Sequence, residues 1–332
     1  MTMQTAWLLL LGGLLAGYFV LGGYDYGAQA LRPLLARGGG RQTTMTALGP
    51  FFFGNEVWLV AFAGVLFGAF PFLEGPLLAG LYPVLVPLLL ALVAGKAAVQ
   101  LRGRARTRSA ERVWDALITA GGLVPALLWG TVTGVLLNGV AFTGGHSIAV
   151  GAALASPTVL LCTAAAGLLF TAHGAAYLAL RTRGTTAGRA AVLLGRLAPA
   201  AAGASVLAVA AALATGGAPA NPAVAAVLGA VLAAALLGAQ IASRQGRSGA
   251  AFACTCAAAA VFAALPWAAH YPYVLADAGG GGMEIGAAAA DGATLAVLSA
   301  FGVAVVPLML AYQAAGWWAF RGRVDDRTPS YL

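Results

Sequence analysis

The sequence predicts an all-α membrane protein that crosses the bilayer about nine times and forms a single transmembrane domain over residues 1–332. Hydrophobic residues make up 61% of the chain and charged residues only 8%, about a third of the charged fraction of an ordinary soluble domain. Residues 116–180 and 197–243 carry no charge, and each run exceeds the roughly 20 residues that cross a bilayer. The basic residues fall in short clusters between apolar runs, as in polytopic membrane proteins.

The same composition excludes several other classes. A water-soluble globule of this size carries more charge, and the chain lacks the heptads of a coiled coil and the Gly-X-Y period of a collagen. The formal net charge is +8, but its placement between apolar spans indicates membrane topology, so we expect no nucleic-acid partner. Cys254 and Cys256 point about 200° apart on a helix, which favours small buried side chains over a disulfide or a zinc site.

Apolar runs between charged or Pro/Gly-rich breaks predict the nine spans. Residues 1–6 contain no positive charge, so we expect no cleavable signal and a first span that stays in the mature protein. Several spans reach 25 residues, which favours tilt or extension beyond the hydrocarbon. In chain order the spans are 6–31, 51–73, 76–101, 113–138, 156–180, 197–215, 221–242, 249–271 and 291–320. The charged, glycine or proline residues at which they break are, in the same order, Arg32, Glu74, Arg102, Gly139, Arg181, Gly216, Arg244, Pro272 and Arg321.

The charges of the connections predict the orientation. The second, fourth, sixth and eighth connections contain no Lys or Arg, so the positive-inside rule puts the N-terminus outside and the C-terminus in the cytoplasm. An odd number of spans is needed for this alternation. The arginines of the remaining connections and the tail are Arg32, Arg37, Arg41, Arg102, Arg104, Arg106, Arg108, Arg112, Arg181, Arg183, Arg189, Arg196, Arg244, Arg247, Arg321, Arg323 and Arg327.

The longest outer connections are residues 139–155 and 272–290. The second contains four consecutive glycines at 279–282 and the acids Asp277 and Glu284. We expect both connections to be flexible caps. Within the spans, the many glycines and alanines predict helices that approach one another closely.

Three ionisable residues are predicted to lie inside the membrane once the span-end acids Asp115 and Asp291 are set aside. They are Asp25, Glu56 and Lys96, and each is a functional candidate because a charge in hydrocarbon costs a few kcal/mol. Their spacing from Arg32, Pro50 and Arg102 places all three about 9–10 Å from the inner edge at roughly 1.5 Å per residue. The first three spans therefore bring two carboxylates and one ammonium to one level.

Asp25 also begins a polar stripe, because Gln29 and Arg32 follow it on the same helical face. Such a stripe can lead protons or ions inward. The alternative for Asp25 and Glu56 is an ion pair or hydrogen-bonded carboxyl that locks helices together. For Lys96 the alternative is snorkelling to the inner headgroups, although side chains tilt toward the helix N-terminus, which here points outward.

His173 lies inside the fifth predicted span, where a histidine can ligate haem or relay protons. The other two histidines, His146 and His270, fall near the outer ends of spans. No second histidine therefore lies at the depth of His173 inside the membrane, which disfavours haem ligation on this chain. The Gly-Gly pair at 121–122 has no strand before it, which favours helix packing over nucleotide binding.

Two motifs resemble those of one known family. Residues 23–27 read Gly-Tyr-Asp-Tyr-Gly, similar to Gly-Phe-Asp-x-Gly, and residues 54–60 read Gly-Asn-Glu-Val-Trp-Leu-Val, followed at 66–71 by Leu-Phe-Gly-Ala-Phe-Pro. The second stretch resembles Gly-Asn-Glu-Val-Trp-Leu…Phe-Ala-Ala-Phe-Pro of subunit II of the cytochrome bd-type quinol oxidases. Weaker similarity continues at Trp114-Asp115, 173–178, 271–273 and 306–308, and so covers nearly the whole chain.

The resemblance implies a nine-helix subunit of a respiratory complex in the bacterial cell membrane, which oxidises quinol and reduces dioxygen to water. It implies a related partner, subunit I, that holds the b-type haems, the d-type haem and the quinol-oxidising loop. This chain would supply assembly and cytoplasmic proton access, with no direct catalytic residue, no metal and no cofactor expected on it. A structural quinone, membrane lipid and a small accessory subunit are left open. The candidate proton path or polar cluster is Asp25, Gln29, Asn55, Glu56 and Lys96.

The chain also departs from the family pattern. Many relatives carry an acid before Gly-Asn, where this chain has Phe53, and the Phe-Glu-x-Arg of the third span is replaced around Gln100. Two carboxylates are missing. Because Phe53 replaces the first of them, Glu56 is the only carboxyl on its segment, which slightly favours Glu56 over Asp25 as proton carrier. The alternative function is a proton- or cation-coupled secondary transporter that binds its ion at these two acids, although the prolines show no symmetric pair of broken helices.

Overall fold

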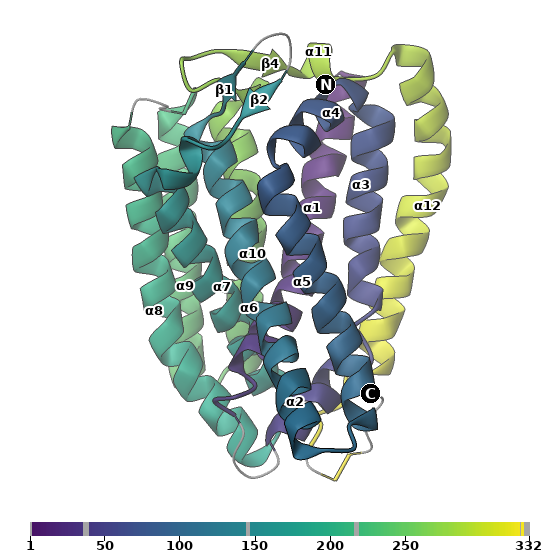
Figure 1. The fold of residues 1–332 in the computed structure, drawn as a ribbon, viewed down its shortest axis with the longest axis vertical. Helices are drawn as coiled ribbons and strands as arrows, with labels where there is room; N and C mark the ends of the chain where they lie inside the picture. The colour runs from purple at the N-terminus through teal and green to yellow at the C-terminus, as the bar shows by residue number, and fades with distance from the viewer. Residues whose placement is uncertain (1, 36–39, 144–146, 216–218, 326, 329–332) are drawn as a thin grey trace.

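A computed structural model describes residues 2–35, 40–143, 147–215, 219–325 and 327–328. Arg37 and His146 lie outside these residues. The described chain is a bundle of long helices that run side by side, with the N-terminus at one end and the C-terminus at the other (Figure 1). The predicted all-α membrane class is confirmed.

Eight helices in the described part are long and apolar enough to cross a membrane. They are α1 (Met3–Leu31), α5 (Tyr82–Leu101), α6 (Arg108–Asn138), α7 (Pro157–Arg181), α8 (Gly184–Ala214), α9 (Pro222–Arg244), α10 (Ser248–His270) and α12 (Gly292–Ala319). A ninth, shorter apolar segment consists of the 3-10 turn η2 (Gly54–Glu56) and α3 (Val57–Ala69). It occupies the place of the second predicted span.

The second and third predicted spans differ from the helices observed. Phe70, with φ −131° and ψ 55°, ends α3, and Pro71 begins a separate short helix, α4 (Pro71–Gly80). Proline cannot donate a backbone hydrogen bond and is suited to the first helical turn. The break therefore falls before residue 76, and α5 begins only at Tyr82.

The helix at the place of the sixth predicted span begins earlier than the sequence predicts. Helix α8 starts at Gly184, not at residue 197, and so includes Arg189 and Arg196. One face of this first part, with Thr186, Ala190 and Leu194, is buried. Because an amphipathic helix can extend past the hydrocarbon, the arginines do not end it. The first connection also contains a short helix, α2 (Gly40–Leu48).

The two long connections at the N-terminal end contain antiparallel strand pairs in their described residues, and the flexibility of these connections stays a prediction. Strands β1 (Ala141–Phe142) and β2 (Ile148–Ala149) pair antiparallel, as do β3 (Tyr273–Ala276) and β4 (Gly282–Glu284). Positive φ angles at residues 280–282 explain the glycine run, because glycine adopts that conformation without strain. The remaining short elements are η3 (Arg102–Arg104), η4 (Ala153–Ala155) and α11 (Ile285–Ala288).

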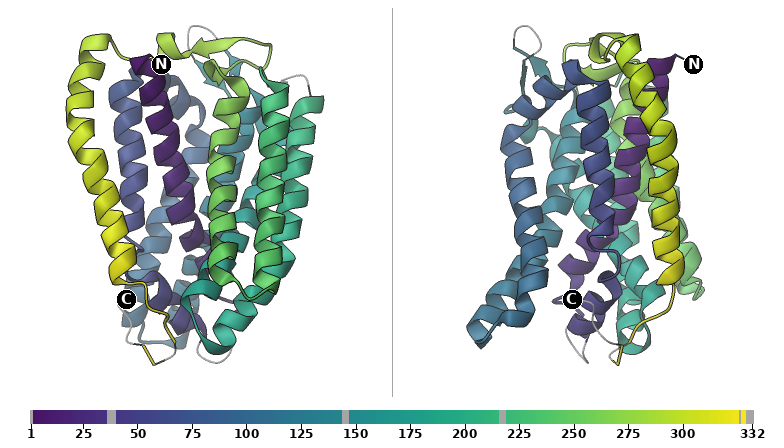
Figure 2. Two further views of the ribbon diagram at one scale, coloured as in Figure 1. Left: turned by 180° about the vertical axis from the view of Figure 1, so that it is seen from behind. Right: turned by 90° about the vertical axis from the view of Figure 1, so that its right-hand side faces the viewer.

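Helix α1 lies in the interior of the bundle and packs against α6, α7 and α10, whereas α12 lies at the edge and is mostly exposed (Figures 1 and 2). Small residues allow the closest approaches. A Cβ added at Gly27 would lie 1.9 Å from the Phe170 carbonyl oxygen of α7, and one added at Gly121 would lie 2.3 Å from the Cα of Gly95. The first contact joins α1 to α7, and the second joins α5 to α6 beside Lys96.

Candidate functional site

An ion cluster forms where α1, η2 and α5 meet. The Lys96 Nζ atom lies 3.0 Å from Glu56 Oε1 and 3.9 Å from Asp25 Oδ2. The side chains of Asp25, Lys96 and Glu56 are 1%, 15% and 26% exposed. The cluster therefore runs from a fully enclosed carboxylate to one that reaches the protein surface.

Asn55 fixes the enclosed end of the cluster. Its Nδ2 atom lies 3.0 Å from Asp25 Oδ2, 3.0 Å from the Leu21 carbonyl oxygen and 2.8 Å from the Tyr24 hydroxyl. The 3-10 turn η2 directs Asn55 inward, where it is fully buried, while the next residue, Glu56, stays partly exposed. The Gly-Asn-Glu sequence thus places an amide against Asp25 and a carboxylate against Lys96.

Lys96 points into the cluster. Its ammonium donates a hydrogen bond of 2.6 Å to the Phe52 carbonyl oxygen and lies 3.5 Å from the centre of the Phe52 ring. These contacts hold the ammonium against the end of the first connection. The side chain of Lys96 therefore does not extend to the inner headgroups. Gln29 folds onto its own helix, because its Nε2 atom donates to the Asp25 carbonyl oxygen at 3.1 Å.

Three further residues join the cluster that the sequence did not reveal. The Tyr18 hydroxyl donates to Glu56 Oε2 at 3.3 Å, and it is also hydrogen-bonded to the Tyr26 hydroxyl. Gln313 of α12 donates to Asn55 Oδ1 at 3.5 Å. The sequence feature that could have revealed Tyr18 is its helical spacing from Asp25. For Gln313, that feature is the presence of a polar residue within an apolar span.

Asp115, set aside in the sequence analysis as a span-end acid, binds three arginines. Its carboxylate lies 2.6 Å from Arg32 Nη1 and 3.3 Å from Arg41 Nη1, and it also accepts from Arg102 Nε. This carboxylate joins the end of α1 to α2, η3 and α6. The polar stripe from Asp25 through Gln29 to Arg32 therefore ends on a fixed ion network.

The histidines in the described residues do not fit haem ligation. His173 Nε2 donates to the Val20 carbonyl oxygen at 2.8 Å, and its Nδ1 atom is hydrogen-bonded to the Thr255 hydroxyl at 2.8 Å. Both ring nitrogens are thus engaged. His270 Nε2 donates to the Leu137 carbonyl oxygen at 2.9 Å. Over the described ranges, no group of three or more His, Cys, Asp or Glu residues is arranged to hold a metal ion.

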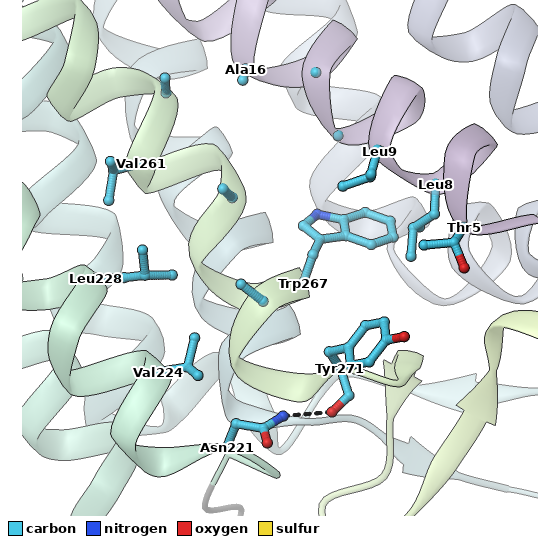
Figure 3. A pocket seen from close by; sticks show the side chains of 15 residues that line it. Thr5, Leu8, Leu9, Ala16, Asn221, Val224, Leu228, Val261, Trp267 and Tyr271 are labelled. Atoms are coloured by element: carbon cyan, nitrogen blue, oxygen red, sulfur yellow. Dashed lines mark hydrogen bonds between the residues drawn. The ribbon is translucent and has the colours of Figure 1, made fainter. Parts of the chain in front are cut away.

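A groove of about 720 Å³ lies between α1, α9 and α10 near the N-terminal end of the bundle. Its walls are almost entirely apolar, with Leu8, Val261 and Trp267 among them (Figure 3). At its polar end, Asn221 donates a hydrogen bond of 2.5 Å to the Tyr271 carbonyl oxygen. The groove has the lining expected for a hydrocarbon chain.

A bundle of apolar helices that encloses a fixed ion cluster defines a multi-pass membrane protein. The family model described as "Cytochrome bd terminal oxidase subunit II" matches residues 3–320. The chain belongs to this family, and it is a multi-pass membrane protein of bacterial type.

Curated relatives agree with this family over part of the chain. "Probable cytochrome oxidase subunit 2" of Haemophilus influenzae is 32% identical over 53% of this chain and 48% of its own length. "Cytochrome bd ubiquinol oxidase subunit 2" of Bacillus subtilis is 31% identical over 57% of this chain and 56% of its own length. "Cytochrome bd-I ubiquinol oxidase subunit 2" of Escherichia coli K12 is 31% identical over 54% and 48%. The chain thus spans about half the length of the curated relatives it matches.

A solved structure shows the same fold over a longer range. A chain described as "The structure of bd oxidase from Geobacillus thermodenitrificans" superposes with a TM-score of 0.74 at 18% sequence identity. The match covers 96% of this chain and 98% of that chain. The helical arrangement is therefore shared over nearly the whole length.

Proposed function

We propose that this chain is the second subunit of a bd-type quinol oxidase, an oxidoreductase complex that oxidises quinol and reduces dioxygen to water. The family match over residues 3–320 carries this proposal. We further propose that residues 1–332 act as one transmembrane domain and that a haem-bearing subunit I is the obligate partner. Quinol, dioxygen, membrane lipid and a small accessory subunit complete the proposed complex.

In this proposal, the chain takes protons from the cytoplasm. The arginine-rich connections define the cytoplasmic end by the positive-inside rule, with the N-terminus outside. Asp25, Gln29, Asn55, Glu56 and Lys96 form the proposed path. Since Glu56 is partly exposed and Asp25 is enclosed, Glu56 exchanges protons with the surface of the subunit and Asp25 holds the inner end.

The position of Lys96 counts against the cation-coupled form of the transporter alternative. A cation-coupled transporter needs carboxylates that are open to the transported ion. Here the ammonium of Lys96 already lies within 4 Å of both Asp25 and Glu56, so the protein supplies its own cation. This arrangement supports proton exchange between neighbouring groups and disfavours an exchangeable metal cation.

The b-type and d-type haems are proposed to lie in the partner, where they supply the electron transfer and oxygen chemistry. The engaged nitrogens of His173 support this assignment. A structural quinone, if this chain holds one, fits the apolar groove beside Trp267 better than the charged cluster, because an isoprenoid tail needs an apolar lining.

A reduced-minus-oxidised visible spectrum tests the proposed function. The chain is purified from its native membrane, once with its partner and once after expression alone. We expect b- and d-type bands in the complex and no stoichiometric haem on the isolated chain. Stoichiometric haem on the isolated chain, or a complex without haem, contradicts the proposal.

A further inference from the structure

The connection between α5 and α6 carries a dense group of arginines. Five fall within residues 102–112, and the side chains of Arg104, Arg106, Arg108 and Arg112 are exposed. We call these four residues the arginine tip. In the right-hand view of Figure 2, this connection lies at the lower end of the bundle and is set off to one side of the other helices. The tip therefore offers four positive charges to its surroundings.

The protein does not neutralise these charges itself. Among the described residues, none of the four side chains has a hydrogen-bond or ion-pair partner. The nearby carboxylate of Asp115 is already shared by Arg32, Arg41 and Arg102, and the one acid within the connection is Glu111. The tip therefore keeps an excess of positive charge that a partner can neutralise.

The apolar surface next to the tip sets its level in the membrane. Val113 directly follows Arg112 and is 58% exposed, and Leu90 and Val93 on α5 are 64% and 68% exposed. Exposed apolar side chains at this density belong against lipid hydrocarbon. Because Arg112 directly precedes the exposed Val113, the base of the tip lies at the level of the phospholipid headgroups.

We propose that the arginine tip binds the phosphate groups of anionic phospholipids. The planar guanidinium group matches phosphate with two parallel hydrogen bonds, and basic residues at the membrane surface favour anionic lipid. Each arginine contributes about a fivefold gain in affinity. The proposal is independent of the redox function, since it rests on the charge and position of this connection alone.

Lipid retention by the purified complex tests the proposal. Wild-type complex is exchanged into nanodiscs with equal amounts of phosphatidylglycerol and phosphatidylcholine, and the lipids that it retains are counted by native mass spectrometry. The test variant is Arg106→Gln with Arg108→Gln, which leaves the capping residue Thr107 in place. The charge-matched control is Arg244→Gln with Arg247→Gln, two exposed arginines in another connection.

We expect the wild type to retain phosphatidylglycerol selectively, and the tip variant to bind it roughly 30-fold more weakly, with a weaker salt dependence because two of the four arginines remain. The control pair should keep selective retention. Equal retention of both lipids by the wild type, or equal losses in the tip and control variants, overturns the proposal. If the first tip variant does not fold, Arg104→Gln with Arg112→Gln makes the same test, and thermal unfolding verifies the fold of each variant.

Discussion

Lys96 Nζ lies 3.0 Å from Glu56 Oε1, so the ammonium of α5 and the carboxylate that ends η2 form a direct ion pair inside the bundle. Asp25 lies 3.9 Å from the same ammonium. One positive charge thus serves two carboxylates. Because the cluster is sparingly solvated, a carboxylate there without a counter-charge is costly.

Removing the ammonium should destabilise the bundle. In Lys96→Met, two carboxylates lose their counter-charge, and we expect a loss of about 3 kcal/mol in the free energy of unfolding. Thermal unfolding of the purified complex measures it. The double variant Lys96→Met with Glu56→Gln should recover part of the loss, because one uncompensated charge is then absent. Unchanged stability in Lys96→Met rules out the ion pair as a structural element.

Asp115→Asn should loosen the arginine-rich end of the bundle. The substitution removes the charge that holds Arg32, which is 3% exposed, and we expect a loss of about 2 kcal/mol in unfolding free energy. Glu111→Gln, an exposed change on the same helix, is the matched control and should have little effect. Equal unfolding temperatures in the two variants contradict the role given to Asp115.

The α5–α6 contact should not tolerate a methyl group. In Gly121→Ala, the added Cβ would lie 2.3 Å from the Cα of Gly95, so the helices must separate, at a cost of about 1–3 kcal/mol. The control is Gly75→Ala in α4, where a Cβ has no neighbour within 4 Å. Thermal unfolding compares the two variants, and a destabilisation no greater in Gly121→Ala than in Gly75→Ala argues against the close packing.

Cysteine labelling should determine the orientation. In a variant that lacks Cys162, Cys254 and Cys256, a membrane-impermeant thiol reagent should reach Arg106→Cys only from the cytoplasmic side. It should reach Thr143→Cys, which directly follows β1 at the opposite end of the bundle, only from outside. The reversed pattern overturns the predicted topology, and intact and opened vesicles distinguish the two sides.

The sequence predicted the membrane class and the place of the charged cluster. Charge-free runs longer than a bilayer leave little choice of fold class, and the spacing of Asp25, Glu56 and Lys96 from the connections put them at one level. The structure brings these three side chains together. Depth along a helix is thus readable from sequence when charged residues mark its end.

Other features depend on tertiary contacts that no local pattern encodes. Helix α8 continues through Arg189 because one face of its first turns packs against the bundle. The arginines of these turns led to the wrong prediction of a connection there. Gln313 reaches Asn55 from the far end of the chain. Nothing in the sequence around Asp115 indicates that three arginines from different segments form ion pairs with it.

The two carboxylates of the cluster are proposed to carry protons, and turnover per assembled haem is the measurement closest to that role. Oxygen consumption with quinol is measured for Glu56→Gln and Asp25→Asn, each normalised to the haem content of the purified complex. Both variants keep the shape of the side chain and remove its titration, so we expect at least about tenfold slower turnover with normal assembly and an unchanged haem spectrum, and the larger effect in Glu56→Gln. Poor assembly with wild-type turnover per haem would show that these residues only clamp the helices together.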